Sequence, residues 1–102
     1  MLLSERRHGE TTVVDLHGPI DREHGDLTNL LAHLRSLANH GCSDITLNVE
    51  ELIEVDSIVM GTIAHAYIAA SRAGATFRLV NVSPSFRRLL AVTKLDRVIE
   101  TL

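Results

Sequence analysis

Apolar residues in the first half of the chain recur at the spacing of an α-helix. Six of them fall three or four positions apart and so share one helical face: Leu27, Leu30, Leu31, Leu34, Leu37 and Ala38. His40-Gly41 follows, and glycine is a favourable stop because it readily adopts the left-handed conformation that ends many helices. The pattern therefore predicts an amphipathic helix that ends at His40-Gly41.

Before this helix, the pattern indicates a pair of strands. Residues 11–17 alternate in part, with Val14 and Leu16 on one face, and Gly18-Pro19 closes the segment as a turn signal. Residues 2–7 precede it at a short distance. We expect the two segments to pair as a β-hairpin that opens the fold.

After the helix, strand and helix patterns alternate. Ile45, Leu47 and Val49 alternate as a strand, and residues 76–82 predict a further one. Between them, the apolar run from Ile58 onward is long enough for a helix and carries a polar stripe. Strands that alternate with helices require crossovers. The predicted fold is therefore α/β, a small mixed sheet with helices packed on it.

A short helix is expected near the end of the chain. Ser83 is a favoured cap residue and Pro84 suits the first helical position. Phe86, Leu89 and Leu90 follow at i, i+3 and i+4, so we expect one face of this helix to be buried.

The central helix has two distinct faces when it is drawn at 100° per residue. One narrow stripe, which we expect to face solvent, consists of Ile58, Thr62, His65, Ala69 and Arg72. The opposite side, expected to pack on the sheet, consists of Val59, Met60, Ile63, Tyr67 and Ala70. Ile58 is the exception, an apolar residue at the head of an otherwise polar stripe and beside Ser57.

Composition narrows the class of protein. The chain has 102 residues, 45% of them apolar and 23% charged, which is ordinary for one globular domain spanning residues 1–102. Its formal charge of −3 argues against nucleic acid as a partner. No apolar stretch approaches the roughly 20 residues of a membrane helix, so we expect no membrane insertion, although the protein could serve a membrane complex. Cys42 is the only cysteine and residues 1–9 lack a signal-peptide pattern, so we expect a cytoplasmic location.

Few residues indicate a metal site, a cofactor site or an enzyme active site. The six histidines show no compact ligand spacing and Cys42 stands alone, so no metal or other cofactor is predicted. Asp15 and the Glu50-Glu51 pair are expected to be exposed polar positions. The chain shows no nucleophile–base pair, glycine-rich phosphate loop or paired catalytic carboxylates, so we do not expect an enzyme.

Asp56 and Ser57 lie where the strand pattern gives way to the helical one. Aspartate and serine are both favoured helix caps, because their side-chain oxygens accept backbone N–H groups that the helix leaves unpaired. The same position suits a phosphate, since the N-terminus of a helix favours negative charge. From the residues alone, Ser57 is either a structural cap or a phosphorylation switch.

Three segments carry a family resemblance: "LHGPID" at residues 16–21, "ITLNVEELIEVDS" at residues 45–57 and "NVSPSFRRLLAVTKLDRVIE" at residues 81–100. They resemble the STAS domain, specifically the stand-alone anti-sigma-factor antagonists of bacteria. The resemblance covers nearly the whole chain and implies a small mixed sheet with helices mainly on one side. The family usually continues its switch motif as Asp-Ser-Ser/Thr-Gly-Leu-Gly. Here Ile58 and Val59 replace the second hydroxyl and the first glycine.

The resemblance implies a partner and a switch. In that family the serine of the Asp-Ser pair is phosphorylated by the partner anti-sigma factor, which is a serine kinase, and Ser57 occupies that position. Asp21 matches an acidic residue of the family's binding face. The docking surface that we predict consists of Asp21, Asp56, Ser57, Ile58 and Thr62.

The predicted function is that of an anti-sigma-factor antagonist. The unmodified protein would bind the anti-sigma factor and free sigma, and phosphorylation of Ser57 would break the contact. The alternative is an unswitched STAS adaptor of a signalling scaffold or a lipid-transport complex, in which Ser57 only caps the helix and Ile58 packs on a protein partner. The sequence leaves open which sigma factor and kinase are involved, and whether the chain forms a homodimer.

Overall fold

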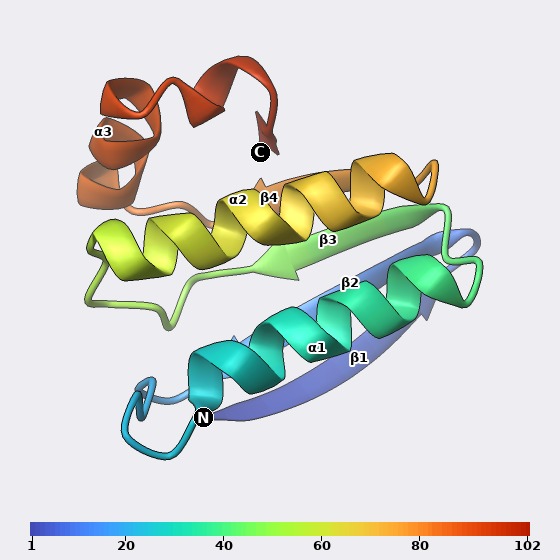
Figure 1. Ribbon diagram of the computed structural model, residues 1–102, viewed down its shortest axis with the longest axis horizontal. Helices are drawn as coiled ribbons and strands as arrows, with labels where there is room; N and C mark the ends of the chain where they lie inside the picture. The colour runs from blue at the N-terminus through green and yellow to red at the C-terminus, as the bar shows by residue number, and fades with distance from the viewer.

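The computed structural model describes residues 1–102 and contains a five-stranded mixed sheet in the order β1-β2-β3-β4-β5 (Figure 1). The first two strands form the predicted antiparallel hairpin, and every later neighbour is parallel. The strands are β1 (Leu2–His8), β2 (Thr11–His17), β3 (Asp44–Asn48), β4 (Thr76–Val80) and β5 (Glu100–Thr101).

Helices cross over between the parallel strands. The predicted Leu-rich helix is α1 (Asp26–Asn39), the central helix is α2 (Ser57–Arg72) and the short one is α3 (Pro84–Val92), followed by a 3₁₀ turn, η1 (Leu95–Arg97). Figure 1 shows α1 and α2 side by side on one face of the sheet, with α3 beyond α2 near the C-terminus. The mixed sheet with helices mainly on one side is confirmed.

The core lies between the sheet and these helices. From the sheet it takes Val14, Leu16, Ile45, Leu47, Phe77 and Leu79, all buried. The predicted inner side of α2 is confirmed, since four of its residues are buried and Tyr67 is half-buried against the core: Val59, Met60, Ile63 and Ala70 are the four. Phe86 and Leu90 of α3 are buried as well, with Leu89 partly so.

The C-terminal part of the sheet differs from the expectation. β4 ends at Val80 rather than at residue 82, because Asn81 has a φ of 60°, which takes the backbone out of the extended region. Its side-chain Nδ2 donates to Asn48 Oδ1 at 3.0 Å. The two residues of β5 were not predicted, and the backbone bond from Leu102 N to Leu79 O, at 2.8 Å, continues their pairing with β4.

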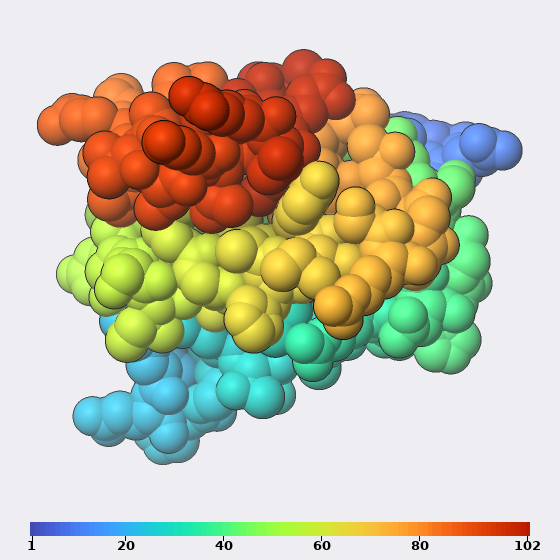
Figure 2. All heavy atoms as spheres, turned by 45° about the horizontal axis from the view of Figure 1, so that its top comes forward, coloured from blue at the N-terminus to red at the C-terminus, as the bar shows by residue number.

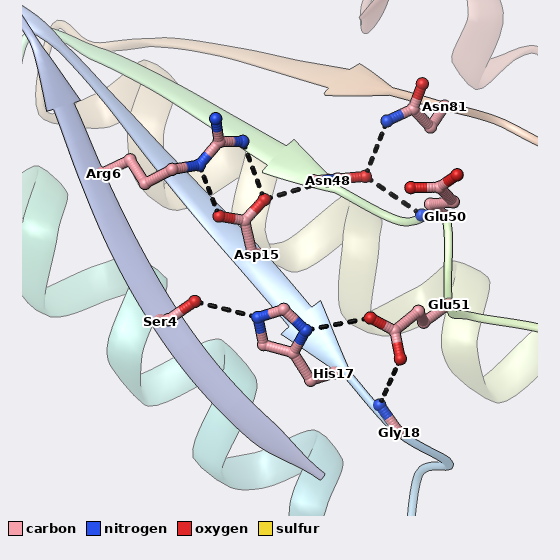
Figure 3. Close-up of polar contacts among 9 residues, drawn as sticks. All are labelled: Ser4, Arg6, Asp15, His17, Gly18, Asn48, Glu50, Glu51 and Asn81. Atoms are coloured by element: carbon pink, nitrogen blue, oxygen red, sulfur yellow. Dashed lines mark hydrogen bonds and ion pairs between the residues drawn. The ribbon is translucent and has the colours of Figure 1, made fainter.

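Asp15 is buried on the sheet face that α1 and α2 leave uncovered, so the prediction that it is exposed is wrong. Its carboxylate accepts two hydrogen bonds from Arg6, Nε to Oδ2 at 2.7 Å and Nη2 to Oδ1 at 2.9 Å. Asn48 Nδ2 donates to Oδ1 at 2.8 Å (Figure 3). The Arg6 hydrogen bonds lower the pKa of Asp15 from its usual value. Pairing of β1 and β3 on either side of β2 encloses this carboxylate between two donors.

Candidate functional site

The first turn of α2 is capped by Asp56. Its backbone is extended, and its Oδ1 accepts hydrogen bonds from the backbone N–H groups of Ile58 and Val59, each at 3.1 Å. Ser57 is the first residue of the helix, is exposed and takes no part in this cap. The cap therefore belongs to Asp56, and the interpretation of Ser57 as the capping residue is wrong.

Arg22 links a second loop to this helix start. It lies in the β2–α1 loop (residues 18–25), and its Nη1 donates to Oδ2 of Asp56 in the β3–α2 loop (residues 49–56). This hydrogen bond is the largest influence that lowers the pKa of Asp56, and the pair raises the pKa of Arg22. The two loops meet because β2 and β3 are parallel neighbours whose carboxyl ends share one edge of the sheet.

Arg22 was missed from the sequence, although it follows Asp21 directly. No spacing or motif marks it, since its significance comes from a residue 34 positions away. A charged side chain next to a predicted site residue was the one available signal.

Asp21 lies in the loop that carries Arg22, and its side chain contacts His24 rather than Ser57. Its Oδ1 accepts the backbone N–H of His24 at 3.2 Å, and its Oδ2 pairs with the ring of the same histidine. Its own N–H donates to Asp26 Oδ2 at 2.6 Å, at the start of α1. Asp21 is exposed, so it remains available to a partner at the same end of the sheet.

Three of the five residues on the predicted outer stripe of α2 are exposed, and Thr62 and Ala69 are half-buried. Ile58 is 60% exposed, and His65 and Arg72 are exposed too. Thr62 is half-buried, and its hydroxyl donates to the backbone oxygen of Ile58 at 3.1 Å. Figure 2 shows the surface of α2, in yellow-green to light orange, between the cyan-to-green α1 side and the orange-to-red C-terminal segment.

A hollow of about 640 Å³ lies between the β2–α1 and β3–α2 loops. Ile20 and Arg22 line it from one loop, Ile53 and Glu54 from the other. Ile53 is 85% exposed, which adds a second apolar side chain near this end of the sheet.

Glu51 ties the two loops together at the base of this hollow. Its Oε2 pairs with His17 Nδ1 at 2.9 Å, and its Oε1 accepts the Gly18 N–H at 3.2 Å (Figure 3). Ser4 Oγ lies 2.9 Å from the other ring nitrogen of His17. The contact with His17 is the main cause of the lowered pKa of Glu51. Glu51 is exposed as predicted, but it also holds the β3–α2 loop against the end of β2.

The histidines do not gather into a metal site. No three side chains among His, Cys, Asp and Glu come together in a group that could hold a metal ion. None of the helices combines the length and the apolar character required to cross a membrane.

A known protein family matches almost the whole chain. The family model described as "Mlab, STAS domain" matches residues 3–101. No protein of curated function matches the chain significantly in sequence.

Three solved structures share the fold over almost the whole chain. An anti-sigma factor antagonist from Mycobacterium paratuberculosis is 18% identical with a TM-score of 0.79, over 98% of this chain and 83% of that one. Phosphorylated SpoIIAA, the Bacillus cell fate determinant, is 21% identical with a TM-score of 0.75, over 99% and 91%. Moorella thermoacetica RsbS is 18% identical with a TM-score of 0.78, over 98% and 85%.

Proposed function

The chain belongs to the STAS domain family, and we propose on that basis that it is an anti-sigma-factor antagonist controlled by phosphorylation of Ser57. The observation that carries this proposal is Ser57 itself, exposed at the first position of α2 beside the Asp56 cap. The structural likeness to antagonists from Bacillus and Mycobacterium supports it. The partner we propose is an anti-sigma factor with serine kinase activity, in the cytoplasm.

The first step is binding of the unmodified protein. The docking surface combines exposed Ile58 with the Asp21 and Asp56 carboxylates, while Ser57 and Thr62 border them on the same end of α2. An apolar anchor ringed by polar groups is the usual composition of a protein–protein contact. Occupation of the anti-sigma factor by this surface releases the sigma factor, so the chain acts by binding and catalyses nothing itself.

The second step is phosphorylation by the partner. Ser57 Oγ forms a bond to the γ-phosphorus of ATP, the bond from that phosphorus to the bridging oxygen breaks, ADP leaves, and a base of the kinase takes the hydroxyl proton. The new group adds about −1.5 to −2 charge beside Asp56. The phosphate adds bulk and negative charge to the docking surface, so the shape and charge that fit the partner before modification no longer do so. The docked complex therefore separates.

A second candidate is the unswitched adaptor. Two observations favour it: Ile58 and Val59 stand in place of the family's hydroxyl and glycine, and the matching family model is described as Mlab rather than as an antagonist. In this function Ser57 stays unmodified and exposed Ile58 packs permanently on a protein partner.

The test pairs phosphorylation with binding. Purified anti-sigma-factor kinases of the same organism are incubated with the protein and ATP, with Ser57→Ala as the control, and phosphate is located by mass spectrometry. Calorimetry then compares wild type, Ser57→Ala and Ser57→Asp. We expect Ser57→Ala to retain affinity and Ser57→Asp to lose about tenfold or more. Equal affinity of Ser57→Asp and wild type, with no phosphate on Ser57, would support the adaptor.

A further inference from the structure

Arg22 has donors to spare at the start of α2. Its Nη1 donates to Asp56, and that is the ion pair it makes within the chain. A guanidinium group carries five N–H donors in a rigid fork, so Nε and Nη2 remain available. The Arg22 side chain is 37% exposed, so it is partly accessible to a new partner.

Three of the four backbone donors at the helix start are already occupied. The Ile58 and Val59 N–H groups donate to Asp56 Oδ1, and the Met60 N–H donates to the Asp56 backbone oxygen at 3.0 Å. Of the donors that usually hold an anion at a helix N-terminus, a phosphate on Ser57 therefore has only the Ser57 N–H. A nearby cation would supply the further donors that it needs.

Arg22 is the cation bound to the carboxylate next to Ser57. Asp56 is the direct neighbour of Ser57 in the chain, and Glu54 lies near enough to Arg22 to raise the pKa of that guanidinium. Asp21 is bound to His24 in the facing loop. Without Arg22, a phosphate on Ser57 would lie beside an Asp56 carboxylate that has lost its bound cation.

We propose that Arg22 binds the phosphate of phosphorylated Ser57 and bridges it to Asp56. Nη1 stays on the Asp56 carboxylate while Nε or Nη2 donates to a phosphate oxygen, an arrangement that suits the planar fork of arginine. This inference rests on the proposed function only in taking Ser57 as the modified residue.

The bridge gives the modification a structural consequence. Arg22 lies in the β2–α1 loop, so the phosphate would tie that loop to α2 through a second contact beside the existing one. Asp21 precedes Arg22 in the same loop. Phosphorylation would thus fasten the loop that carries Asp21 more firmly to α2, in addition to changing the charge at Ser57.

Phosphorus NMR of the full chain tests the bridge. Phosphoserine is installed at position 57 during translation, and the phosphorus chemical shift is followed against pH to obtain the second pKa of the phosphate. A cation at hydrogen-bond distance favours the dianion, so we expect Arg22→Gln to raise that pKa by about 0.5 or more. Arg72→Gln is the matched control. It removes the same charge from the last turn of the same helix, and we expect no change in the phosphate pKa.

A second measurement leaves Arg22 in place. The Arg22 Nε–H resonance is compared in the protein with serine and with phosphoserine at position 57, and a phosphate contact should shift it downfield and slow its exchange with water. Arg22→Lys keeps the charge without the fork and should retain part of the lowered phosphate pKa. If Arg22→Gln does not fold, the Arg22 Nε–H resonance and the phosphate pKa in Arg22→Lys still test the bridge.

An unchanged phosphate pKa in folded Arg22→Gln, or an Arg22 Nε–H resonance unmoved by the phosphate, would overturn the bridge. Because phosphoserine is installed during translation, neither a kinase nor a sigma factor enters the experiment. A negative result therefore leaves the proposed function standing, and failure of every kinase to act on Ser57 leaves this result unaffected.

Discussion

Two of the arginine–aspartate pairs that link neighbouring segments of this protein have different surroundings. The Asp15 side chain, on the open face of the sheet, is 9% exposed and accepts hydrogen bonds from Arg6 and Asn48. The Asp56 side chain, at the start of α2, is 46% exposed and divides its oxygens between Arg22 and the helix cap. The carboxylate of the pair is buried in one place and half-exposed in the other.

The difference separates structural from functional roles. When a buried carboxylate is removed, its donors lose a partner that water cannot replace. When an exposed one is removed, water takes its place, and such a pair contributes little to stability. The open-face pair therefore serves the fold, whereas the helix-start pair is available to a binding partner or a phosphate.

The largest effect is expected from Asp15→Ala. Loss of this acceptor leaves the Asn48 donor without its partner, while the half-exposed Arg6 can turn to water, so the free energy of unfolding should fall by about 2 kcal/mol. Denaturant unfolding followed by circular dichroism measures it. Asp56→Ala is the matched control and should lose less, about 1 kcal/mol for the helix cap, because water can replace the exposed contact with Arg22. The comparison of the two pairs would break down if Asp56→Ala destabilised the protein as much as Asp15→Ala.

Asp15 and Asp56 should also differ in how much they contribute to the loss of stability at low pH. The pKa values of Asp15 and Asp56 are lowered in the folded protein. The stability they contribute is therefore present above their unfolded pKa of about 4 and disappears as pH falls through the folded values. The free energy of unfolding decreases as the pH falls. We expect Asp15→Asn to reduce this decrease more than Asp56→Asn does. Unfolding free energies measured from about pH 7 down to about pH 3 test this, and an equal effect of both variants would contradict it.

Ile58→Ser tests whether Ile58 at the start of α2 contributes to binding rather than to stability. Its side chain is largely exposed, so the free energy of unfolding should change by less than about 0.5 kcal/mol. Binding to the anti-sigma factor should weaken by about 1–2 kcal/mol, because an apolar anchor is lost from the docking surface.

The control for Ile58→Ser is Ile68→Ser, which makes the same change on the same helix outside the docking surface. Denaturation and calorimetry on both variants provide the answer. Equal affinity of Ile58→Ser and wild type would show that the docking surface lies elsewhere. A large loss of stability would show that Ile58 belongs to the core.

The smallest effect is expected from Ser57→Ala. Because Asp56 caps the helix, removal of the Ser57 hydroxyl should change the free energy of unfolding by less than about 0.5 kcal/mol. Thermal unfolding of this variant beside Asp56→Ala tests the assignment of the cap. A greater loss in Ser57→Ala than in Asp56→Ala would return the capping role to Ser57.

Local patterns were sufficient for most of the fold. The leucine spacing of α1 and the alternation of β2 were visible in the sequence, and so was the division of α2 between Ile58 outside and Ile63 inside. Each of these depends on residues within a few positions of one another, and burial of an apolar stripe is what stabilises each element. The same periodicity placed Ser57 at the start of a helix.

The long-range contacts were decided by the tertiary structure alone. Burial of Asp15 required β1 and β3 to flank β2 in one register, and the Arg22–Asp56 pair required two loops to meet at one edge of the sheet. β5 is too short to show any alternation and exists because the edge of β4 offers it backbone partners. Periodicity reports which face of an element is apolar. It carries no information about which polar groups from distant segments will meet, because strand order and register determine that only once the chain has folded.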